Sequence, residues 1–245
     1  MTKNECFGIP FDDDRPEDIV RYALELIGQE KGSFVVTPNP EIILAAERNP
    51  ALHVALLGAN LILPDGVGLI WASKILGKPL RHRFPGIDFA SALMEKLAER
   101  QGSVYLLGAR PGVAQSAADN LLRHYPGLCV VGIHHGYYPR EEEASLLTDI
   151  RQSQPDLLLV CLGSPRQEIW MSSHSSDFPG TLMIGLGGAL DVYAGRIRRA
   201  PALWRRLGLE WLFRLLQEPY RIMRMIRLPG ILWAAIKEKA GRKHE

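Results

Sequence analysis

The 245-residue sequence has little cysteine, and what it has is not arranged for a disulfide framework or a metal site. Cys6, Cys129 and Cys161 are odd in number and lack the paired spacing of metal ligands. Cys129 and Cys161 lie in apolar runs. We therefore interpret the cysteines as buried free thiols of a reducing cytoplasm.

Long hydrophobic segments are also missing. No window approaches the roughly 18 consecutive apolar residues that a membrane-spanning helix needs. Residues 1–6 lack the apolar core of a signal peptide. The sequence therefore predicts a soluble or peripherally bound protein. Its hydrophobic content of 47% and charged content of 23% are those of a globular chain that can bury a core.

Two common nucleotide-binding motifs are absent, and a third motif is present only formally. The chain contains no complete Gly-x-Gly-x-x-Gly or Walker pattern, which argues against a dinucleotide or P-loop site. The acidic run 12–14 satisfies the Asp-x-Asp pattern of metal-dependent sugar transferases, but it precedes a helical pattern and follows no buried strand. We interpret this run as a solvated turn, and expect neither a metal site nor a cofactor.

The small net charge of +2 hides an uneven distribution of charge. Residues 195–245 carry 13 Lys or Arg and 4 Asp or Glu, whereas residues 1–194 carry 16 and 23. We therefore predict two parts: an α/β catalytic domain at 1–194 and a basic, amphipathic C-terminal appendage at 195–245. Such asymmetry indicates a polyanionic partner.

The basic appendage interleaves arginines with aromatic and aliphatic residues. Arg221, Arg224 and Arg227 recur every three residues, which on a helix makes one basic stripe beside Ile and Met. Short helices of this composition are typical of interfacial membrane segments, so we favour an anionic membrane surface as the partner. The alternatives are a helical hairpin packed on the body, and nucleic acid, for which no readout motif is present.

Apolar, strand-like segments alternate with helical patterns along most of the chain. This alternation predicts an α/β fold with a Rossmann-like, mostly parallel sheet flanked by helices, followed by the basic helical appendage. The predicted strands are 33–36, 61–63, 103–107, 129–133, 156–162 and 181–185.

Polar or glycine residues follow several predicted strands at the point where each strand ends. Because ligands of open parallel sheets bind outside the carboxyl ends of the strands, we expect one pocket there, built for a polar, phosphorylated ligand. Glycines in such turns let the backbone approach a ligand closely. The candidate residues are Thr37, Asn39, Asp65, Arg83, Gly163, Gln167, Gly187, Gly188 and Asp191.

Asp65 is the main catalytic candidate from the pattern alone. It follows a short apolar run and Pro64, and it precedes the helical pattern that begins at Val67. A single carboxylate at this place can act as a general base, or it can simply cap the helix. The same two interpretations apply to Thr37 and Asn39, which precede another helical pattern.

Taken together, these motifs resemble the WecG/TagA/CpsF glycosyltransferase family, whose members assemble bacterial polysaccharides and wall teichoic acid. The resemblance covers most of the chain in order, and only the part after residue 228 matches loosely. The matching segments are 37–39, 63–66, 83–88, 105–108, 135–137, 162–168, 187–191, 198–201, 209–211 and 218–221.

The resemblance implies an inverting, metal-independent transfer of N-acetylmannosamine, or a related sugar. The donor would be a UDP-sugar and the acceptor the 4-hydroxyl of N-acetylglucosamine on undecaprenyl diphosphate. Asp65 would be the general base that deprotonates this hydroxyl. Thr37, Asn39 and Gln167 would orient donor and acceptor.

The resemblance also assigns binding roles toward the nucleotide. Asp191, with the Gly187-Gly188 turn, would contact the nucleoside. Because no metal is expected, arginines or backbone amides would stabilise the UDP leaving group. Those that the resemblance implies are Arg214, Arg221 and Arg224 in the appendage. Arg83 is a candidate from the residues alone, since the basic loop 78–85 can bind phosphate or form ordinary solvated surface.

The implied location is the cytoplasmic face of the bacterial inner membrane, with the protein bound peripherally. A homo-oligomer is compatible with this interpretation. Two alternatives stay open at this point. One is a transferase of the same family with another donor, such as UDP-glucose or a uronic acid derivative. The other is a non-catalytic regulator that binds nucleotide sugars at the membrane.

Overall fold

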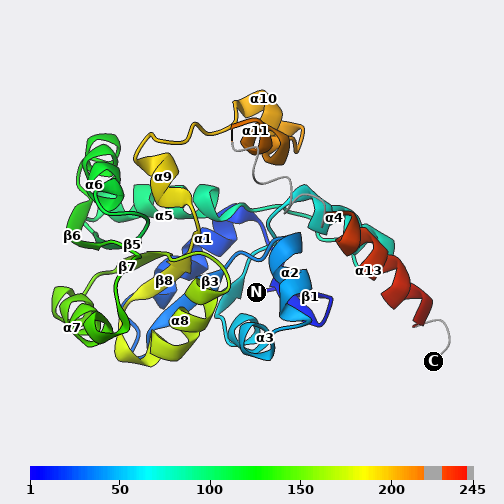
Figure 1. The fold of residues 1–245 in the computed structure, drawn as a ribbon, viewed down its shortest axis with the longest axis horizontal. Coiled ribbons are helices and arrows are strands. Elements are labelled where there is room, and N and C mark those ends of the chain that lie inside the picture. The colour runs from blue at the N-terminus through cyan, green and yellow to red at the C-terminus, as the bar shows by residue number, and fades with distance from the viewer. Residues whose placement is uncertain (218–227, 242–245) are drawn as a thin grey trace.

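The computed structural model describes residues 1–217 and 228–241, and a parallel β-sheet lies at its centre (Figure 1). The six strands are ordered β4-β3-β8-β7-β5-β6, and each pair of neighbours is parallel. Each strand begins and ends within one residue of its predicted bounds, so the α/β prediction is confirmed. The strands are β3 (Ser33–Val36), β4 (Leu61–Ile62), β5 (Ser103–Gly108), β6 (Cys129–His134), β7 (Leu157–Cys161) and β8 (Leu182–Gly185).

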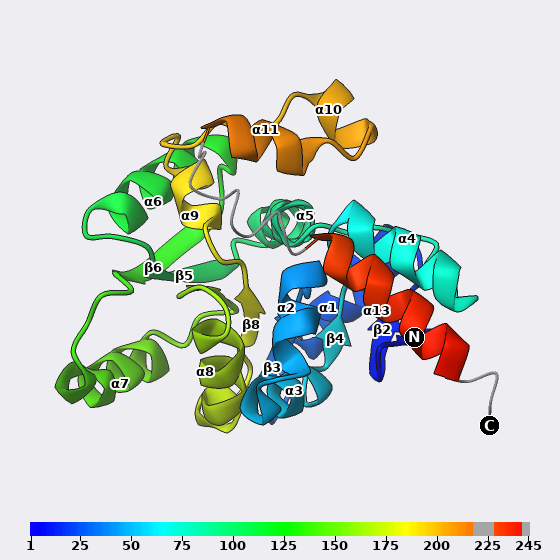
Figure 2. The ribbon, with the colours of Figure 1, turned by 45° about the vertical axis from the view of Figure 1, so that its right-hand side comes forward.

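Helices cover both faces of the sheet, as Figures 1 and 2 show. The first face packs against α1 (Pro16–Leu26), α5 (Gly86–Glu99), α6 (Val113–His124) and α9 (Ala189–Tyr193). The second packs against α2 (Pro40–Ala46), α3 (Pro50–Leu57), α4 (Val67–Leu76), α7 (Glu143–Ser153) and α8 (Arg166–His174). Two short 3₁₀ helices, η1 (Arg140–Glu142) and η2 (Ser175–Asp177), adjoin α7 and α8.

Alternation along the strands explains why both faces are apolar. Leu106 and Leu159 point into the core under α5 and α6, whereas their neighbours Leu107 and Leu158 point into the core under α7 and α8. All four are fully buried. Strands that are covered on both faces read as continuous apolar runs, which is why they were predictable.

The sequence did not predict the N-terminal hairpin, in which β1 (Lys3–Cys6) pairs antiparallel with β2 (Ile9–Asp12). It ends in the acidic run, and the interpretation of that run as a solvated turn is wrong. Asp12 is fully buried, pairs with the Lys3 ammonium at 2.7 Å and accepts a hydrogen bond from the Ile62 N–H at 2.8 Å. The run therefore holds the edge strand β4 in place.

Asp13 has an equivalent role toward the basic loop 78–85. It is 6% exposed, and its Oδ1 accepts hydrogen bonds from the backbone N–H groups of Arg81 at 2.7 Å and His82 at 3.2 Å. These bonds fix the loop without using its side chains. The arginines of the loop are thereby left available for other contacts.

The appendage contains α10 (Ala202–Arg206), α11 (Glu210–Gln217) and α13 (Leu228–Gly241). α13 lies along α4 and also contacts α2, and it buries Ile231 and Ala235 completely. This inner face agrees with the hypothesis of a helix packed on the body. The outer face of α13 is not packed on the body, because Trp233 is 62% exposed and Ile236 is 56% exposed. The arginine stripe 221–227 lies outside the described residues.

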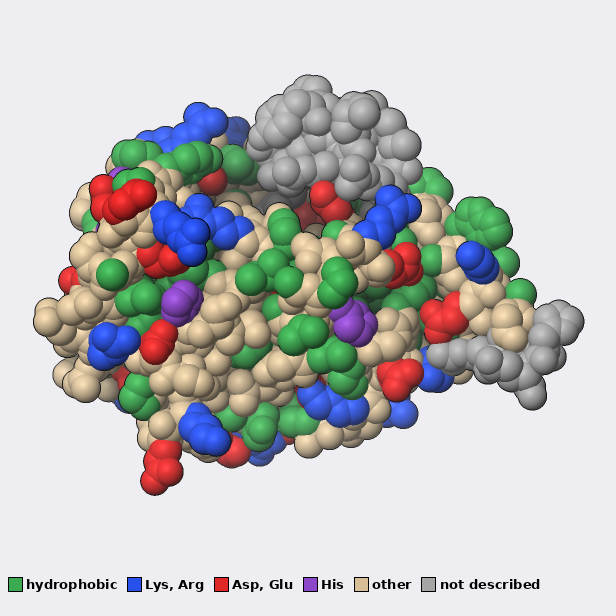
Figure 3. Space-filling model, turned by 60° about the horizontal axis from the view of Figure 1, so that its bottom comes forward, with side chains coloured by type: hydrophobic (Ala, Val, Ile, Leu, Met, Phe, Trp, Pro, Cys, Tyr) green, Lys and Arg blue, Asp and Glu red, His purple; other side chains and the backbone are tan. Residues whose placement is uncertain are grey.

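One carboxylate joins the start of the appendage to α5. Asp88 forms ion pairs with Arg199 and, at 3.6 Å, with Arg205. Part of the basic excess is thus neutralised on the body. On the face shown in Figure 3, acidic and basic side chains are interspersed, as on an ordinary solvated surface.

The cysteines differ from their predicted burial at one position. Cys6 and Cys161 are buried thiols that form no disulfide within the described residues, but Cys129 is exposed. The prediction was wrong there because Cys129 begins β6, which is an edge strand. Within residues 1–217 and 228–241, no helix is long and apolar enough to cross a membrane.

Replacing Asp13 by alanine tests its hold on the basic loop. The change leaves two backbone N–H groups without their acceptor, so we expect the free energy of unfolding to fall by about 2–3 kcal/mol. Urea denaturation measures this loss. Asp14→Ala is the control, since Asp14 bonds only near the N-terminus, at the Thr2 N–H. Equal, small effects in both variants would contradict the assignment.

Candidate active site at the carboxyl edge of the sheet

Asp65 lies where the ends of β3 and β4 meet. The Leu63 N–H donates to the Val36 carbonyl at 2.9 Å, and the Asp65 N–H donates to the Pro38 carbonyl at 3.4 Å. The helix α4 begins at Val67 with Gly66 at its N-cap position. Asp65 therefore does not occupy the N-cap position, and its partly buried carboxylate sits one residue outside it.

Asn39 does cap a helix. Its Oδ1 accepts a hydrogen bond from the Ile42 N–H at 3.1 Å, which satisfies one free donor at the start of α2. The capping interpretation is therefore correct for this oxygen. The bond leaves the amide nitrogen of Asn39 uninvolved in the cap.

Thr37 ends the neighbouring strand β3 and contacts two other segments. Its Oγ1 lies 3.5 Å from the Gly185 carbonyl at the end of β8. The first turn of α5 closes on the same point, where a Cβ at Gly86 would lie 2.8 Å from the Thr37 Oγ1 and 3.0 Å from Leu186. Only glycine fits this approach, so α5 can begin directly against the ends of β3 and β8.

Gln167 is 4% exposed and both ends of its amide are held. The Oε1 accepts a hydrogen bond from the Gly187 N–H at 2.9 Å, and the Nε2 donates to the Glu168 Oε1 at 2.9 Å. Gln167 thus connects the start of α8 to the turn after β8. The hydrogen bond to Glu168 uses one of the two hydrogens of the Gln167 amide nitrogen.

Glu168 is a site residue that sequence reasoning did not single out. It is 2% exposed, and its Oε2 has no hydrogen-bond partner among the described residues. Burial raises the pKa of the Glu168 carboxyl above its ordinary value. Its position directly after Gln167 in the 162–168 motif was the available signal. The sequence does not show that Glu168 is buried, and the burial of an ionisable group is what marks it as a site residue.

The Gly187-Gly188 turn leaves open space above the backbone. A Cβ at either glycine would meet nothing within 4 Å, and Gly187 has a φ of +54°. Asp191 follows in the short helix α9, where its carbonyl accepts hydrogen bonds from the Arg196 and Ile197 N–H groups. A ligand can therefore lie on this turn without displacing a side chain.

The thiol behind α9 is not a candidate nucleophile. Burial raises the pKa of the Cys161 thiol to about 12. At neutral pH the group is the protonated thiol, which is a weak nucleophile. Cys161 is therefore a poor candidate for a covalent catalyst.

Arg83 connects the Asp65 turn to the appendage. The Phe84 N–H donates to the Pro64 carbonyl at 3.0 Å, which places the end of the basic loop beside Asp65. The Arg83 Nη2 then donates to the Arg205 carbonyl at 3.2 Å, in α10. The other predicted arginines are not tested, because the Arg214 side chain and residues 218–227 lie outside the described part of the chain.

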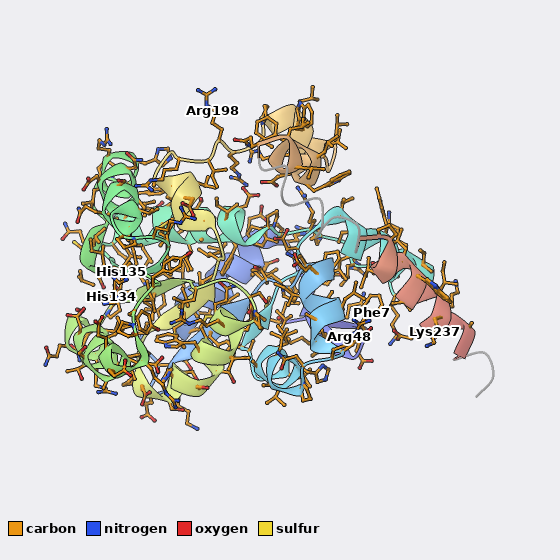
Figure 4. The ribbon with its side chains drawn as sticks, in the orientation of Figure 1. Phe7, Arg48, His134, His135, Arg198 and Lys237 are labelled. Carbon is orange, nitrogen blue, oxygen red and sulfur yellow. The ribbon has the colours of Figure 1, made fainter. Side chains whose placement is uncertain are left out.

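The loops after β5, β6 and β7 form the other half of the edge. The Gly136 N–H donates to the Ala109 carbonyl at 2.8 Å, and the Arg166 Nη1 donates to the Gly136 carbonyl at 2.9 Å. The Arg166 guanidinium lies 4.8 Å from the centre of the Tyr138 ring. Figure 4 shows His134 and His135 close together at the end of β6. Sequence reasoning did not single out Arg166.

The predicted site residues thus lie along one continuous edge. Thr37, Asn39, Asp65 and Arg83 follow β3 and β4, whereas Gln167 and Gly187 follow β7 and β8. Among the residues that the structure describes, no three His, Cys, Asp or Glu side chains are grouped to hold a metal ion. The edge offers carboxyl groups at Asp65, Glu168 and Asp191, amide groups, open backbone and an arginine.

Comparison with known proteins identifies the family of this chain. The model of the family described as "Glycosyl transferase WecG/TagA/CpsF family" matches residues 4–245. A Bacillus spizizenii protein is 38% identical over 218 residues, which cover 89% of this chain and 84% of that protein. A protein of Staphylococcus aureus strain MW2 is 34% identical over 240 residues, which cover 97% and 94%.

Both relatives bear the name N-acetylglucosaminyldiphosphoundecaprenol N-acetyl-beta-D-mannosaminyltransferase. The family match spans both the α/β body and the basic appendage. The chain belongs to the WecG/TagA/CpsF family of glycosyl transferases.

Proposed function

We propose that this protein transfers N-acetylmannosamine, or a related sugar, from a UDP-sugar to N-acetylglucosamine on undecaprenyl diphosphate. The acceptor atom is the 4-hydroxyl oxygen, the anomeric centre is inverted and no metal takes part. The observation that carries the proposal is the shared name of two relatives that match at least 84% of their own length. The placement of Asp65 at the edge supports it independently.

Asp65 is the general base in this mechanism. It removes the proton from the acceptor hydroxyl as that oxygen attacks the anomeric carbon of the donor, and UDP departs with the bonding electrons. A carboxylate suits this role because the proton is transferred only as the hydroxyl becomes nucleophilic. Its support is positional: Asp65 is partly buried, and its turn is hydrogen-bonded to the segments that hold Thr37 and Arg83.

The donor lies on the Gly187-Gly188 turn, with Asp191 toward the nucleoside. Gln167 supports the turn through the Gly187 N–H and directs its remaining amide hydrogen to the donor or the acceptor. Thr37 and Asn39 orient the sugars from β3. The unobstructed backbone at both glycines supports this placement.

Arginines balance the charge that develops on UDP. Arg83 is the described candidate, and Arg214, Arg221 and Arg224 are the candidates that the appendage contributes. Guanidinium groups bind diphosphate oxygens in pairs and keep their charge at any working pH. Residues 195–245 thus complete the site of the catalytic domain formed by residues 1–194.

We place the protein at the cytoplasmic face of the bacterial inner membrane, bound peripherally as a monomer or homo-oligomer. The lipid-linked acceptor of the relatives supports a membrane location. The charge of the appendage supports an anionic surface as the partner. Exposed Trp233 and Ile236 on α13 supply apolar groups for the interface.

Transfer and its metal dependence are measured as acceptor-dependent UDP release in EDTA. UDP-N-acetylmannosamine should release UDP only when the lipid-diphosphate acceptor is present, and EDTA should leave the rate unchanged. Release from UDP-glucose or a uronic acid donor instead would keep the family but change the sugar. If the protein binds UDP tightly but releases UDP from no donor, the result would contradict the transferase and favour a non-catalytic regulator that binds nucleotide sugars.

Asp65→Asn tests the role of the base. The substitution keeps the size of the side chain but removes its proton affinity, so we expect kcat to fall by about 100-fold or more. UDP affinity, measured by calorimetry, should change less than about threefold, since the base faces the acceptor. Retention of more than a few per cent of the activity would remove Asp65 from this role.

Glu168→Gln tests the buried carboxyl. Burial raises the Glu168 pKa above its ordinary value of 4.5, so the folded protein binds a proton more strongly than the unfolded chain does. The free energy of unfolding is therefore expected to fall as the pH rises from the ordinary pKa of 4.5 toward the higher pKa of Glu168 in the folded protein. The Gln variant should lose this dependence, as measured by urea unfolding at several pH values. Glu141→Gln, on the surface, is the control and should behave as the wild type.

The arginine stripe is tested by its effect on vesicle binding. Each arginine contributes about 1 kcal/mol at an anionic leaflet, so replacing Arg221, Arg224 and Arg227 by serine should weaken binding roughly 100-fold. Co-sedimentation with vesicles that contain anionic lipid measures this. Serine at three exposed arginines of the body is the matched control, at Arg21, Arg100 and Arg123. If the variant lacking the arginine stripe binds vesicles as well as the wild type, the result would favour a helical hairpin packed on the body over a membrane-binding appendage.

A further inference from the structure

A hollow of about 630 Å³ lies between α4, the basic loop and α10. Figures 1 and 2 both show α10 above the beginning of α4. We call this hollow the α4–α10 pocket. Its lining residues are Val67, Ile70, Trp71, Arg81, Arg83, Ala202, Arg205, Leu207 and Gly208.

The α4–α10 pocket begins beside Asp65. Val67, its first lining residue, is two positions after Asp65 in the chain. Arg83 adjoins Phe84, whose N–H is bonded to the Pro64 carbonyl. A molecule in this pocket can therefore extend to the Asp65 turn, which is where the acceptor hydroxyl must lie.

The polar part of the pocket is positively charged. Three of its lining residues are arginines and none is acidic. Asp88 pairs with Arg205, but Arg83 is bonded only to a backbone carbonyl, and Arg81 has no ion pair among the described residues. The Arg205 Nε is buried and lacks a hydrogen-bond partner in that part of the chain. Such a lining favours a ligand with several anionic oxygens.

The rest of the pocket is apolar, although it faces solvent. Trp71 is 54% exposed and Leu207 is 62% exposed, and both line the hollow with Ile70. Large apolar side chains grouped at an open surface indicate a binding site. Together with the arginines they suit an amphiphile that has an anionic head and a hydrocarbon chain.

We propose that the α4–α10 pocket binds the polyprenyl diphosphate part of the acceptor. Arg81 and Arg205 bind the diphosphate of the acceptor, and the first prenyl units lie along Trp71 and Leu207. This inference rests on the proposed function for the acceptor class. It adds the residues that select a prenyl diphosphate and makes the catalytic body, with α4, part of the lipid-binding surface.

A second hollow of about 530 Å³ provides the comparison. It lies between α2 and α13, and Figure 4 shows Arg48 and Lys237 from these two sides. Glu41 and Glu47 line it as well, so charges of both signs are present. Trp233 lines this hollow and is 62% exposed, close to the exposure of Trp71. Trp233 is therefore a matched control for Trp71.

The first experiment measures binding of farnesyl diphosphate by calorimetry, without vesicles or detergent. The wild type should bind it more tightly than either methyl diphosphate or farnesol. Trp71→Ala should weaken binding of farnesyl diphosphate about tenfold and leave methyl diphosphate unchanged, because it removes apolar contact without adding charge. Arg81→Ala should weaken both diphosphates, and it keeps the backbone bond to Asp13 that holds the loop. Trp233→Ala should change none of these affinities.

Three results would overturn the proposal. They are an unchanged affinity in Trp71→Ala, an equal loss in Trp233→Ala, and a loss in Trp71→Ala that appears only in vesicle binding. The last result would make Trp71 a bilayer contact.

The second experiment measures sugar transfer to soluble acceptors and separates this inference from the proposed function. N-acetylglucosamine diphosphate is supplied with a farnesyl or a methyl group. Trp71→Ala should raise KM about tenfold for the farnesyl acceptor alone, with kcat unchanged. Absence of transfer by the wild type to both acceptors would contradict the proposed function. The calorimetric result decides the pocket in either case.

Discussion

The site depends on the parallel direction of all six strands. Because each strand runs the same way, every strand ends at one edge, and the loops that follow are brought together from distant parts of the chain. Thr37 meets the Gly185 carbonyl, and Gln167 meets the Gly187 N–H, although neither pair is close in sequence. The apolar strands supply the rigidity, and the polar residues just beyond them supply the chemistry.

Three carboxyl groups position this edge, and those of Asp13 and Glu168 are buried. Asp13 binds the backbone of the basic loop, Asp88 pairs with two arginines of the appendage, and Glu168 holds the Gln167 amide. Each replaces lost hydration by hydrogen bonds or an ion pair, which is the condition for burying an acid. The acids thereby keep the arginines and the amide in place, while Asp65 is assigned to the reaction itself.

Sequence reasoning predicted what depends on local pattern and missed what depends on distant partners. Strands covered on both faces are apolar throughout, so their ends, and the polar residues after them, could be located closely. The acidic run 12–14 was misassigned because its partners, Ile62 and Arg81, are remote in the chain. Cys129 looked buried because its run is apolar, but the order of strands in the sheet places β6 at the edge.

The central claim is that the donor lies at the carboxyl edge, on the turn after β8. A crystal structure with UDP bound tests it most directly. The account predicts the nucleotide over Gly187 and Gly188, with Gln167 beneath the turn and Asp191 toward the nucleoside. UDP in the hollow between α2 and α13, away from Asp65, would contradict the account and require another catalytic group.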